Sequence, residues 1–271
     1  MADPRPRGRP RSFDDKTEQN TIQSLDRALT ILRTVSEASG LTLSELASRT
    51  ANSAPTVYRV LTTLQSHGFV EMEEAGQIWH VGSGAFRVGS GFLRRTNVIE
   101  RARQPMQRLM RITGETANLG VEHRDQVLFL AQAETQEVIR AFFPPGTLGA
   151  MHVSGIGKAL LAWLPQARLA QIITDSGLAR FTPHSHTNIA ALSVDLTETR
   201  TRGYAIDDQE RAEGMRCIAA PIFNAYGEPV AGLSISGPTF RIDLSDAGRI
   251  GALVKAAADE VTEATGGRLP G

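Results

Sequence analysis

Two glycines and a lysine stand just before an apolar helical pattern in the stretch HVSGIGKALL, residues 152–161. A phosphate-binding loop needs Gly-x-x-x-x-Gly-Lys-Ser/Thr, because backbone amides hold the phosphates and the hydroxyl binds Mg²⁺. Gly157 and Lys158 match that spacing, but His152 stands where the first glycine belongs and Ala159 replaces the hydroxyl. The stretch therefore argues against a nucleoside triphosphate site.

The same stretch can still hold a small anion. Glycines let a ligand approach the backbone closely, and the free amides at the start of a helix favour negative charge. We expect the free amides to be those of Gly155, Ile156 and Gly157. The alternative is that the glycines only allow a turn to pack tightly on a sheet. Lys158 is interpreted as a solvated charge along the helix.

Further polar groups lie in the apolar stretches of the C-terminal half. Ser234 and Ser236 alternate, so the two-residue period of a strand places both hydroxyls on one face. Cys217 lies on a neighbouring predicted strand, and Asp207 follows RGYAI as a partner for a hydroxyl, a hydrated aldehyde or water. Two hydroxyls, a thiol and free amides suit a small carboxylate. The apolar wall beside them is predicted to consist of Met151, Ile156 and Leu233.

These side chains also allow other interpretations. Cys217 can be a small buried hydrophobe, and Ser234 and Ser236 can bond neighbouring backbone. As an enzymatic nucleophile Cys217 would need an activating base, and the sequence pairs no histidine with it. We therefore predict no catalytic residues, no enzyme and no cofactor. No metal site is predicted either, because compact HxxxH or CxxC spacing is missing among His152, His184, His186 and Cys217.

Length and charge set limits on the partners. With 271 residues the chain exceeds what one average core spans, which favours two domains. Its 29 basic and 29 acidic residues cancel, so no overall charge draws it to nucleic acid or membrane. The sequence has neither a long apolar run nor a secretory signal, so no membrane partner is expected. The lone Cys217 agrees with a reducing compartment, and we predict a cytoplasmic protein.

The first residues, MADPRPRGRPRS, alternate arginine with proline and glycine. Such a composition cannot bury a core, so residues 1–20 are predicted to be a disordered basic arm. Basic arms suit polyanions because neutralised phosphates release counterions. An ordinary solvated tail is the alternative. The arm would reach DNA phosphate or the minor groove through Arg5, Arg7, Arg9 or Arg11.

Three helices and a two-stranded wing are predicted after the arm. Apolar residues recur at helical spacing over 24–35, and LTLSELASRT forms a short helix capped by Thr42 or Ser44. The third helix, within SAPTVYRVLTTLQSHG, has Ser53 as N-cap and a buried stripe of valines and leucines. Strands 69–72 and 78–81 form the wing. The polar face of the third helix suits phosphates and base edges and presents Ser53, Thr56, Arg59 and Thr63.

This arrangement resembles the winged helix-turn-helix DNA-binding domain of the IclR family, the isocitrate-lyase-regulator type of bacterial transcription factor. The strings that carry the likeness are LDRALTIL, LSELA, TVYRVLTTLQSHGFV and WHVGSGAFRVG. The resemblance assigns residues 21–83 to that domain and 84–97 to a linker helix with dimer contacts. Ala51 and Asn52 depart from the Gly and apolar residue that the family generally has in the turn. We expect Asn52 to take the left-handed conformation.

The second domain, residues 98–268, is predicted to have an α+β fold. A helix runs from about 98 to 112, with a kink at Pro105. Strands are predicted in NLGVEHRDQVLFLAQAET on both sides of the turn HRDQ, and in EVIRAFF, GYAIDDQE, RCIAAPIF and PVAGLSISG. Helices are predicted from the glycines to about 163, and over 167–175, 189–202 and 247–264. The strands form a curved antiparallel sheet flanked by helices.

This half is similar to the effector-binding domain of the same family through HVSGIGKALLAWLP, RGYAIDD and EGMRCIAAPIFNAYGEPVAGLSISGP. The resemblance implies that the ligand lies between the sheet and the glycine-rich helix start. RLMRITGETANLGVE and IWHVGSGAFRVG look most like the subgroup that senses glyoxylate in allantoin and glyoxylate utilisation. Ile156 is bulkier than the small residue often found there, which favours a small ligand. The implied effector-binding positions are Ser154, Gly155, Ile156, Gly157, Asp207, Cys217, Ser234 and Ser236.

The sequence thus predicts a DNA-binding transcriptional regulator that senses a small carboxylate, with glyoxylate preferred, and controls genes of C2-acid metabolism. Its partners would be double-stranded operator DNA and a second copy of the chain. The resemblance implies a homodimer that forms a dimer of dimers, a homotetramer, and binds the bacterial nucleoid through its operators. A regulator of the same family that senses another small or aromatic acid is one alternative. An architectural DNA-binding protein without a ligand is another.

Overall fold

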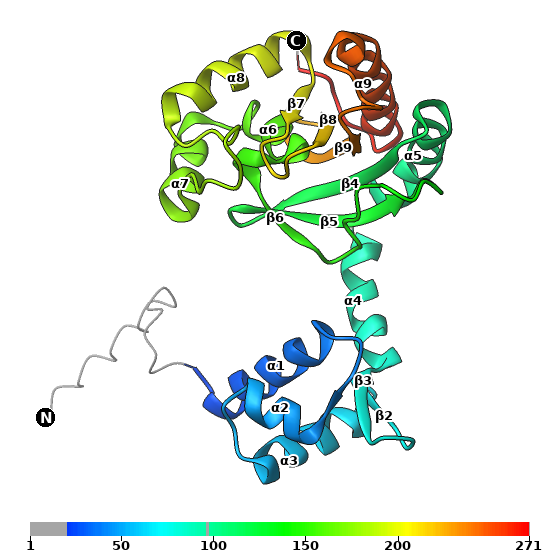
Figure 1. The fold of residues 1–271 in the computed structure, drawn as a ribbon, viewed down its shortest axis with the longest axis vertical. Coiled ribbons are helices and arrows are strands. Elements are labelled where there is room, and N and C mark those ends of the chain that lie inside the picture. The colour runs from blue at the N-terminus through cyan, green and yellow to red at the C-terminus, as the bar shows by residue number, and fades with distance from the viewer. Residues whose placement is uncertain (1–20, 96–97, 271) are drawn as a thin grey trace, which may run out of the picture. The chain divides into compact units, whose positions relative to one another are not determined.

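A computed structural model describes residues 21–95 and 98–270 of the chain, which divides into two compact units after Arg95 (Figure 1). The predicted basic arm, with Arg5, Arg7, Arg9 and Arg11, lies outside the described residues. So does the end of the predicted linker, residues 96–97. No helix within the described ranges is long and apolar enough to cross a membrane.

The first unit contains the predicted helices and wing. In chain order its elements are α1 (Gln23–Ser36), β1 (Leu41–Thr42), α2 (Leu43–Arg49), α3 (Ala54–Ser66), β2 (Val70–Glu73), β3 (Ile78–Val81) and α4 (Ser83–Arg95). Thr42 caps α2 in a reciprocal capping box with Glu45. The sequence did not predict β1, in which Leu41 pairs with Trp79 of the wing. This core is formed by Ile31, Val35, Leu41, Leu46, Val57, Leu61, Val70 and Trp79.

The apolar residues of α1 lie on two sides of the helix, one packed in the core and one exposed. Ile31 and Val35 are buried in the core, whereas Leu25 and Leu29 are more than half exposed. Ile22, the residue before α1, is also exposed, and the spacing of these three exposed residues places them on one side of the helix. The single helix pattern in the sequence therefore contains a core stripe and a second, uncovered apolar stripe.

The second unit is built around a six-stranded antiparallel sheet with the order β6-β5-β4-β9-β8-β7. Its strands are β4 (Thr116–His123), β5 (Gln126–Ala133), β6 (Leu148–Ala150), β7 (Ala205–Asp208), β8 (Met215–Phe223) and β9 (Pro229–Pro238). Two short 3₁₀ helices, η2 (Met151–Val153) and η3 (Leu244–Asp246), connect elements. The α-helices are α5 (Val98–Thr113), α6 (Gly155–Leu161), α7 (Gln166–Ser176), α8 (Ile189–Arg202) and α9 (Ala247–Ala264).

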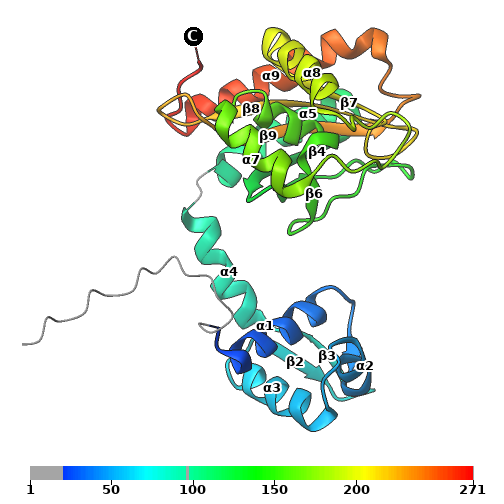
Figure 2. The same cartoon turned by 90° about the vertical axis from the view of Figure 1, so that its left-hand side faces the viewer.

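The sheet separates two hydrophobic clusters, one on each face (Figure 2). Helices α5 and α9 pack on one face, and α6 with its neighbours α7 and α8 covers the other. The strand period explains this division, because Leu233 and Ile235 of β9 join the α5/α9 side whereas Ser234 and Ser236 point to the α6 side. The predicted curved sheet with flanking helices is confirmed.

One predicted strand is wrong. EVIRAFF, residues 137–143, does not join the sheet, and the edge position next to β5 is taken by β6. Val138 is 92% exposed, and Ile139 and Phe142 are also exposed, so most of the apolar residues that suggested a strand face solvent. The end of the segment is packed without forming a strand, since Ala141 is buried and Phe143 stacks on Phe129.

Candidate effector pocket and nucleic-acid interface

Three neighbouring strands bring the predicted polar side chains of the second unit together. Cys217 of β8 is paired with Asp207 of β7 on one side and with Ser236 of β9 on the other. Ser234 lies two residues before Ser236 and therefore on the same face. The N-terminus of α6 packs over this face, with Gly155 in contact with the Cys217 side chain. The sheet register and the packing of α6 thus gather residues that are up to 81 positions apart, from Gly155 to Ser236.

A cavity of about 30 Å³ lies between these strands and α6. The predicted effector-binding positions lining it are Ser154, Gly155, Ile156, Asp207, Cys217, Ser234 and Ser236. Gly157 is not among the lining residues. Its amide donates to the Ser154 hydroxyl at 3.4 Å. The prediction that this amide is free was therefore wrong, since Ser154 caps the helix.

The two glycines of the opening stretch are required by close packing. A Cβ on Gly155 would lie 2.6 Å from the Cys217 Sγ atom, and a Cβ on Gly157 would lie 2.2 Å from the Met151 carbonyl oxygen. The packing interpretation of the sequence therefore applies to both glycines. Gly155 additionally lines the cavity. Because it has no Cβ, its backbone is accessible to a ligand in the cavity.

One hydroxyl in the cavity lacks a partner. Ser234 is buried, and its Oγ atom has no hydrogen-bond partner within the described residues, although it lies close to the Cys217 thiol. Ser236 differs, since its Oγ atom accepts a bond of 3.4 Å from the Asn118 amide. A buried hydroxyl without a partner costs free energy unless a ligand or water supplies one. Ser234 is therefore the atom of the site that most needs a ligand.

Burial changes the acidity of both titratable groups on the strands. It raises the pKa of Asp207 to about 7, helped by the nearby Glu210 carboxylate. Burial, together with the Asp207 carboxyl, raises the pKa of the Cys217 thiol to about 11. A neutral thiol is a weak nucleophile, so the environment of Cys217 suits contact with a ligand and not covalent catalysis.

Six lining residues were not predicted, among them Gly149, Ala150 and Val153. Phe129 and Phe143 stack with ring centroids 4.7 Å apart, and both line the cavity together with Arg211. The predicted wall was therefore wrong in part: Leu233 faces the α5/α9 cluster, and Met151 does not line the cavity. The sequence carries no local signal for Arg211, which stands among acidic residues in the loop that leaves β7.

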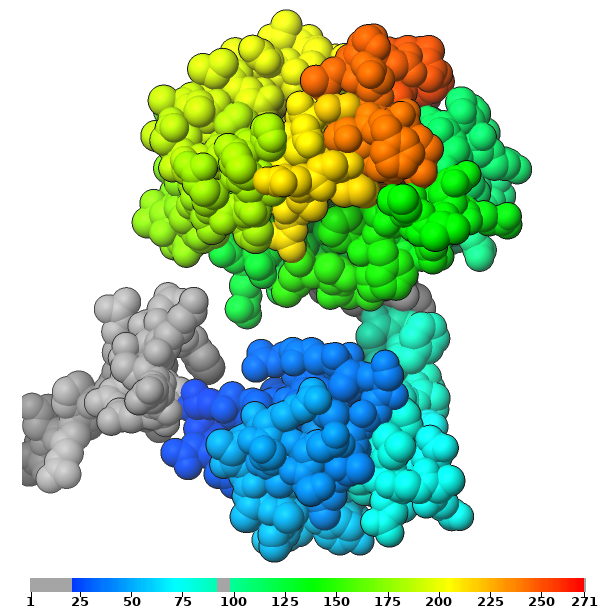
Figure 3. All heavy atoms as spheres, viewed as in Figure 1, coloured from blue at the N-terminus to red at the C-terminus, as the bar shows by residue number. Residues whose placement is uncertain are grey.

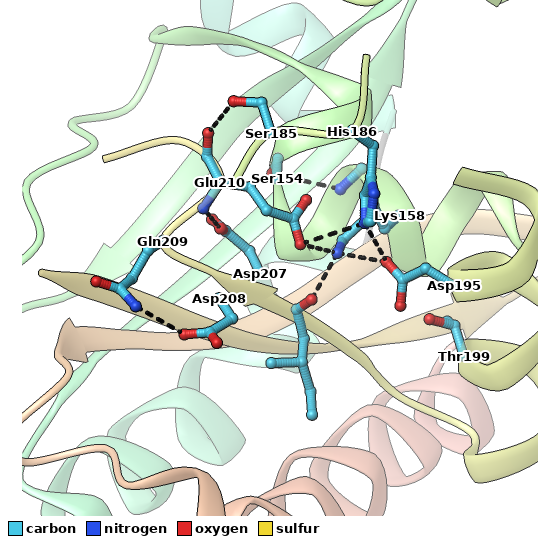
Figure 4. Close-up of polar contacts among 12 residues, drawn as sticks. Ser154, Lys158, Ser185, His186, Asp195, Thr199, Asp207, Asp208, Gln209 and Glu210 are labelled. Carbon is cyan, nitrogen blue, oxygen red and sulfur yellow. Dashed lines mark hydrogen bonds and ion pairs between the residues drawn. The ribbon is translucent and has the colours of Figure 1, made fainter. Parts of the chain in front are cut away.

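Lys158 is not a solvated charge. Its side chain is 0% exposed, and its ammonium donates to Asp195 Oδ2 at 2.5 Å, to the Ile206 carbonyl oxygen at 2.5 Å and to Glu210 Oε1 (Figure 4). Burial lowers the pKa of the ammonium, but the Glu210 and Asp195 carboxylates outweigh it, so the pKa is raised. The sequence could not show this, because its carboxylate partners lie 37 and 52 residues away.

We call Lys158, Asp195, Glu210 and His186 the lysine cluster. His186 Nε2 lies 3.4 Å from Asp195 Oδ2 and 3.8 Å from Glu210 Oε1 (Figure 4). The ligand atoms of His186, Asp195 and Glu210 are all within 4.8 Å of one another, a spacing that could hold a metal ion. The Lys158 ammonium hydrogen-bonds both carboxylates, so a cation of the protein itself already neutralises this group.

The lysine cluster holds the loop that carries the cavity residues. The Glu210 amide donates to Asp207 Oδ1 at 2.8 Å, and the Glu210 carbonyl accepts from Ser185 Oγ at 2.7 Å. Thr182 Oγ1 donates to the neighbouring Gln209 carbonyl at 2.7 Å. Both Asp207 and Arg211 are therefore positioned by a loop tied to α6 through Lys158.

The predicted DNA-contacting face of the first unit is exposed on α3. Arg59 and Thr63 are exposed and Thr56 is partly exposed, all on the side opposite the buried Val57 and Leu61. Figure 3 shows this part of the chain, in light blue, at the surface of the first unit. The face continues into a groove of about 610 Å³ that is also lined by Arg27 and Tyr58, which the sequence analysis missed.

Two local predictions around α3 need correction. Ser53 stands at the N-cap position, but its hydroxyl bonds Thr56 Oγ1 at 2.8 Å and caps no backbone amide. In the preceding turn Ala51, and not Asn52, has the left-handed conformation, with φ of 51°. Asn52 instead donates its side-chain amide to the Thr50 carbonyl at 2.8 Å. The turn is therefore made without glycine, at the strain that a Cβ brings there.

Comparison with known proteins agrees with both units. The family model for the IclR helix-turn-helix domain matches residues 24–74, and the one for the bacterial transcriptional regulator IclR C-terminal domain matches residues 90–263. The chain belongs to the IclR family. Its members are DNA-binding transcriptional regulators, and so is this chain; it is not an enzyme.

Full-length relatives extend this assignment. The chain is 51% identical to the HTH-type transcriptional regulator BhcR of Paracoccus denitrificans over 98% of its own length and 94% of the relative. It is 38% identical to the transcriptional repressor IclR of Escherichia coli over 97% of each chain. The crystal structure of Thermotoga maritima IclR matches with a TM-score of 0.78 at 28% identity, covering 91% of this chain and 100% of that one.

Proposed function

We propose that this IclR-family regulator senses a small carboxylate, with glyoxylate as the preferred effector, and thereby controls genes of C2-acid metabolism. The unpartnered Ser234 hydroxyl at a small cavity carries the proposal. It lies on the face where the strands place Cys217 and Ser236, opposite the start of α6. Free amides, hydroxyls and a helix N-terminus are the groups that hold a carboxylate without a metal.

The size of the cavity supports a two-carbon acid. A single water needs roughly 10–15 Å³ by the same measure. The 30 Å³ present corresponds to about two such spheres, and the stacked Phe129 and Phe143 close one wall. Glyoxylate, with five non-hydrogen atoms, needs far less additional room than an aromatic acid, which would have to separate the rings or displace Ile156. This argument favours a small acid over the aromatic alternative.

The chemistry of the lining assigns each group a task. The carboxylate would accept hydrogen bonds from the Ser234 and Ser236 hydroxyls and from the start of α6. Asp207 would bond the hydrated aldehyde of glyoxylate, as an acceptor when ionised and as a donor when protonated. The Cys217 thiol would contact the carbon skeleton of the bound acid. None of these tasks involves breaking a covalent bond.

On the DNA side, the exposed face of α3 would enter the major groove. Thr56, Arg59 and Thr63 follow one side of the helix at intervals of three and four residues, and Arg59 can bond a guanine with two N–H groups. Because one helix contacts few base pairs, we propose a homodimer on paired half-sites. Support comes from the uncovered stripe of Ile22, Leu25 and Leu29, and from the exposed Phe86 of α4 in the same unit.

The DNA half of the proposal is tested with operator duplexes selected by the protein from a random library. Arg59→Ala should weaken binding to the selected duplex by about 1–3 kcal/mol, measured by fluorescence anisotropy, and should change binding to random DNA far less. Arg49→Ala, on α2, is the matched control with one charge removed outside this face. Equal losses on both duplexes would show that Arg59 contacts only phosphate.

The sensing half is tested on the same duplex. Glyoxylate should change the affinity of the protein for its operator, since an effector regulates only if it favours one state of the protein. Glycolate, pyruvate and 4-hydroxybenzoate are compared at equal concentration. A response to 4-hydroxybenzoate alone would favour an aromatic effector, and no response to any small acid would support an architectural protein without a ligand.

A further inference from the structure

Arg211 is the one basic residue among those that line the cavity. Its guanidinium carbon lies 4.6 Å from the centre of the Phe181 ring, and the residue is partly buried. In the part of the chain that the structure describes, no carboxylate pairs with its side chain. The residue is therefore a cation at an anion-sized cavity with only an aromatic ring for a partner.

Three other arginines of this unit, by contrast, are paired with carboxylates. Arg216 bonds Asp208, Arg241 bonds Glu115, and Arg168 bonds Glu122. Each of these side chains uses its planar fork on a carboxylate, the geometry in which arginine binds strongly. An arginine held only over a ring retains those hydrogen-bond donors for a ligand.

The loop around Arg211 fixes its backbone while leaving its side chain free to move. Gln209 and Glu210 accept hydrogen bonds from Thr182 and Ser185 through their carbonyls, and the Glu210 side chain bonds Lys158. The side chain of Arg211 has no hydrogen bond of its own among the described residues. It can therefore exchange between the Phe181 ring and the cavity without any movement of the backbone.

The negative charge of a carboxylate effector also calls for a cation at the cavity. Of the groups that line the cavity, Asp207 is acidic and Cys217 is neutral, so a carboxylate effector would meet no favourable charge without Arg211. Helix amides alone provide partial charge.

We propose that Arg211 is an effector-binding residue that leaves Phe181 and pairs with the carboxylate of the bound acid. This inference rests on the proposed function and adds to it that recognition depends on the charge of the effector. Without an effector the Arg211 guanidinium lies over the Phe181 ring. The ring therefore competes with the effector for the guanidinium.

The test is calorimetric titration of full-length protein with glyoxylate. Arg211→Gln should weaken binding about 10- to 100-fold, the range for a hydrogen bond to a charged group, and should flatten its dependence on ionic strength. Arg211→Lys should recover part of the affinity, because it retains the charge and loses the fork. Arg180→Gln is the matched control, since Arg180 is exposed next to Phe181 and does not line the cavity.

A second variant tests the exchange in the opposite direction. Phe181→Leu removes the competing ring and should tighten glyoxylate binding about two- to fivefold, the size of a cation–π contact. Wild-type affinity in Arg211→Gln would overturn the inference and leave the proposed function standing, and unchanged or weaker binding in Phe181→Leu would overturn the exchange. If wild-type protein binds no small acid, the proposed function and this inference both fail.

Discussion

The effector cavity and the lysine cluster both begin on α6, yet their polar groups are arranged in opposite ways. In the cavity the Ser234 hydroxyl has no partner and Arg211 has no carboxylate within the described residues. In the lysine cluster the Lys158 ammonium makes three hydrogen bonds, and only Glu210 Oε2 lacks a partner. The presence of buried polar side chains alone therefore does not identify a binding site. Groups left unsatisfied around a cavity indicate a ligand, whereas a satisfied ionic group indicates structure.

The largest difference between the two regions should appear in stability. Lys158→Met leaves the buried Glu210 carboxylate without its lysine, while Asp195 keeps Arg202, and should lower the free energy of unfolding by about 3–5 kcal/mol. Urea unfolding measures this loss. Lys255→Met is the control, because Lys255 forms a half-exposed pair with Asp259 worth about 0–1 kcal/mol. Equal, small losses in both variants would show that the lysine cluster is not a structural support.

A smaller effect should appear in the pH dependence of stability. The folded pKa of Asp207, about 7, lies above its ordinary value of 3.8, so folding favours the protonated form. Its contribution is therefore complete below pH 3.8 and is lost as pH rises to about 7 and beyond, by roughly 4 kcal/mol at most. Asp207→Asn should flatten the decline in unfolding free energy between pH 5 and 8. A decline as steep as in the wild type would contradict the raised pKa.

The same contrast explains which parts of the molecule the sequence could predict. The bounds of α8 and α9 agree with the predicted 189–202 and 247–264, because amphipathic spacing is local. Ser234 and Ser236 share a face because strands alternate, which is also local. The partners of Lys158 come from α8 and from the loop after β7, and only the folded sheet brings them together. A lysine after two glycines gives no sign of burial by itself.

Errors elsewhere have similarly physical causes. EVIRAFF has the composition of a strand, but the edge of the sheet beside β5 is taken by β6, and Val138, Ile139 and Phe142 face solvent. The left-handed residue of the turn before α3 is Ala51, although its neighbour Asn52 has the higher preference, because the helices on either side fix which position turns. Arg211 was missed because nothing in the acidic stretch DDQERAE distinguishes a cavity residue from a solvated one.

The central claim, that the unsatisfied groups around the cavity bind a small carboxylate, is tested most directly by titrating glyoxylate into wild-type protein and the Ser234→Ala, Ser236→Ala double variant by calorimetry. We expect wild-type protein to bind and the double variant to lose at least about tenfold in affinity. Operator binding by the ligand-free variant should persist, and its free energy of unfolding should stay within about 1 kcal/mol of wild type, because Ser234 loses no partner and Ser236 loses only a long bond of 3.4 Å from the Asn118 amide. An unchanged titration in the double variant would contradict the account.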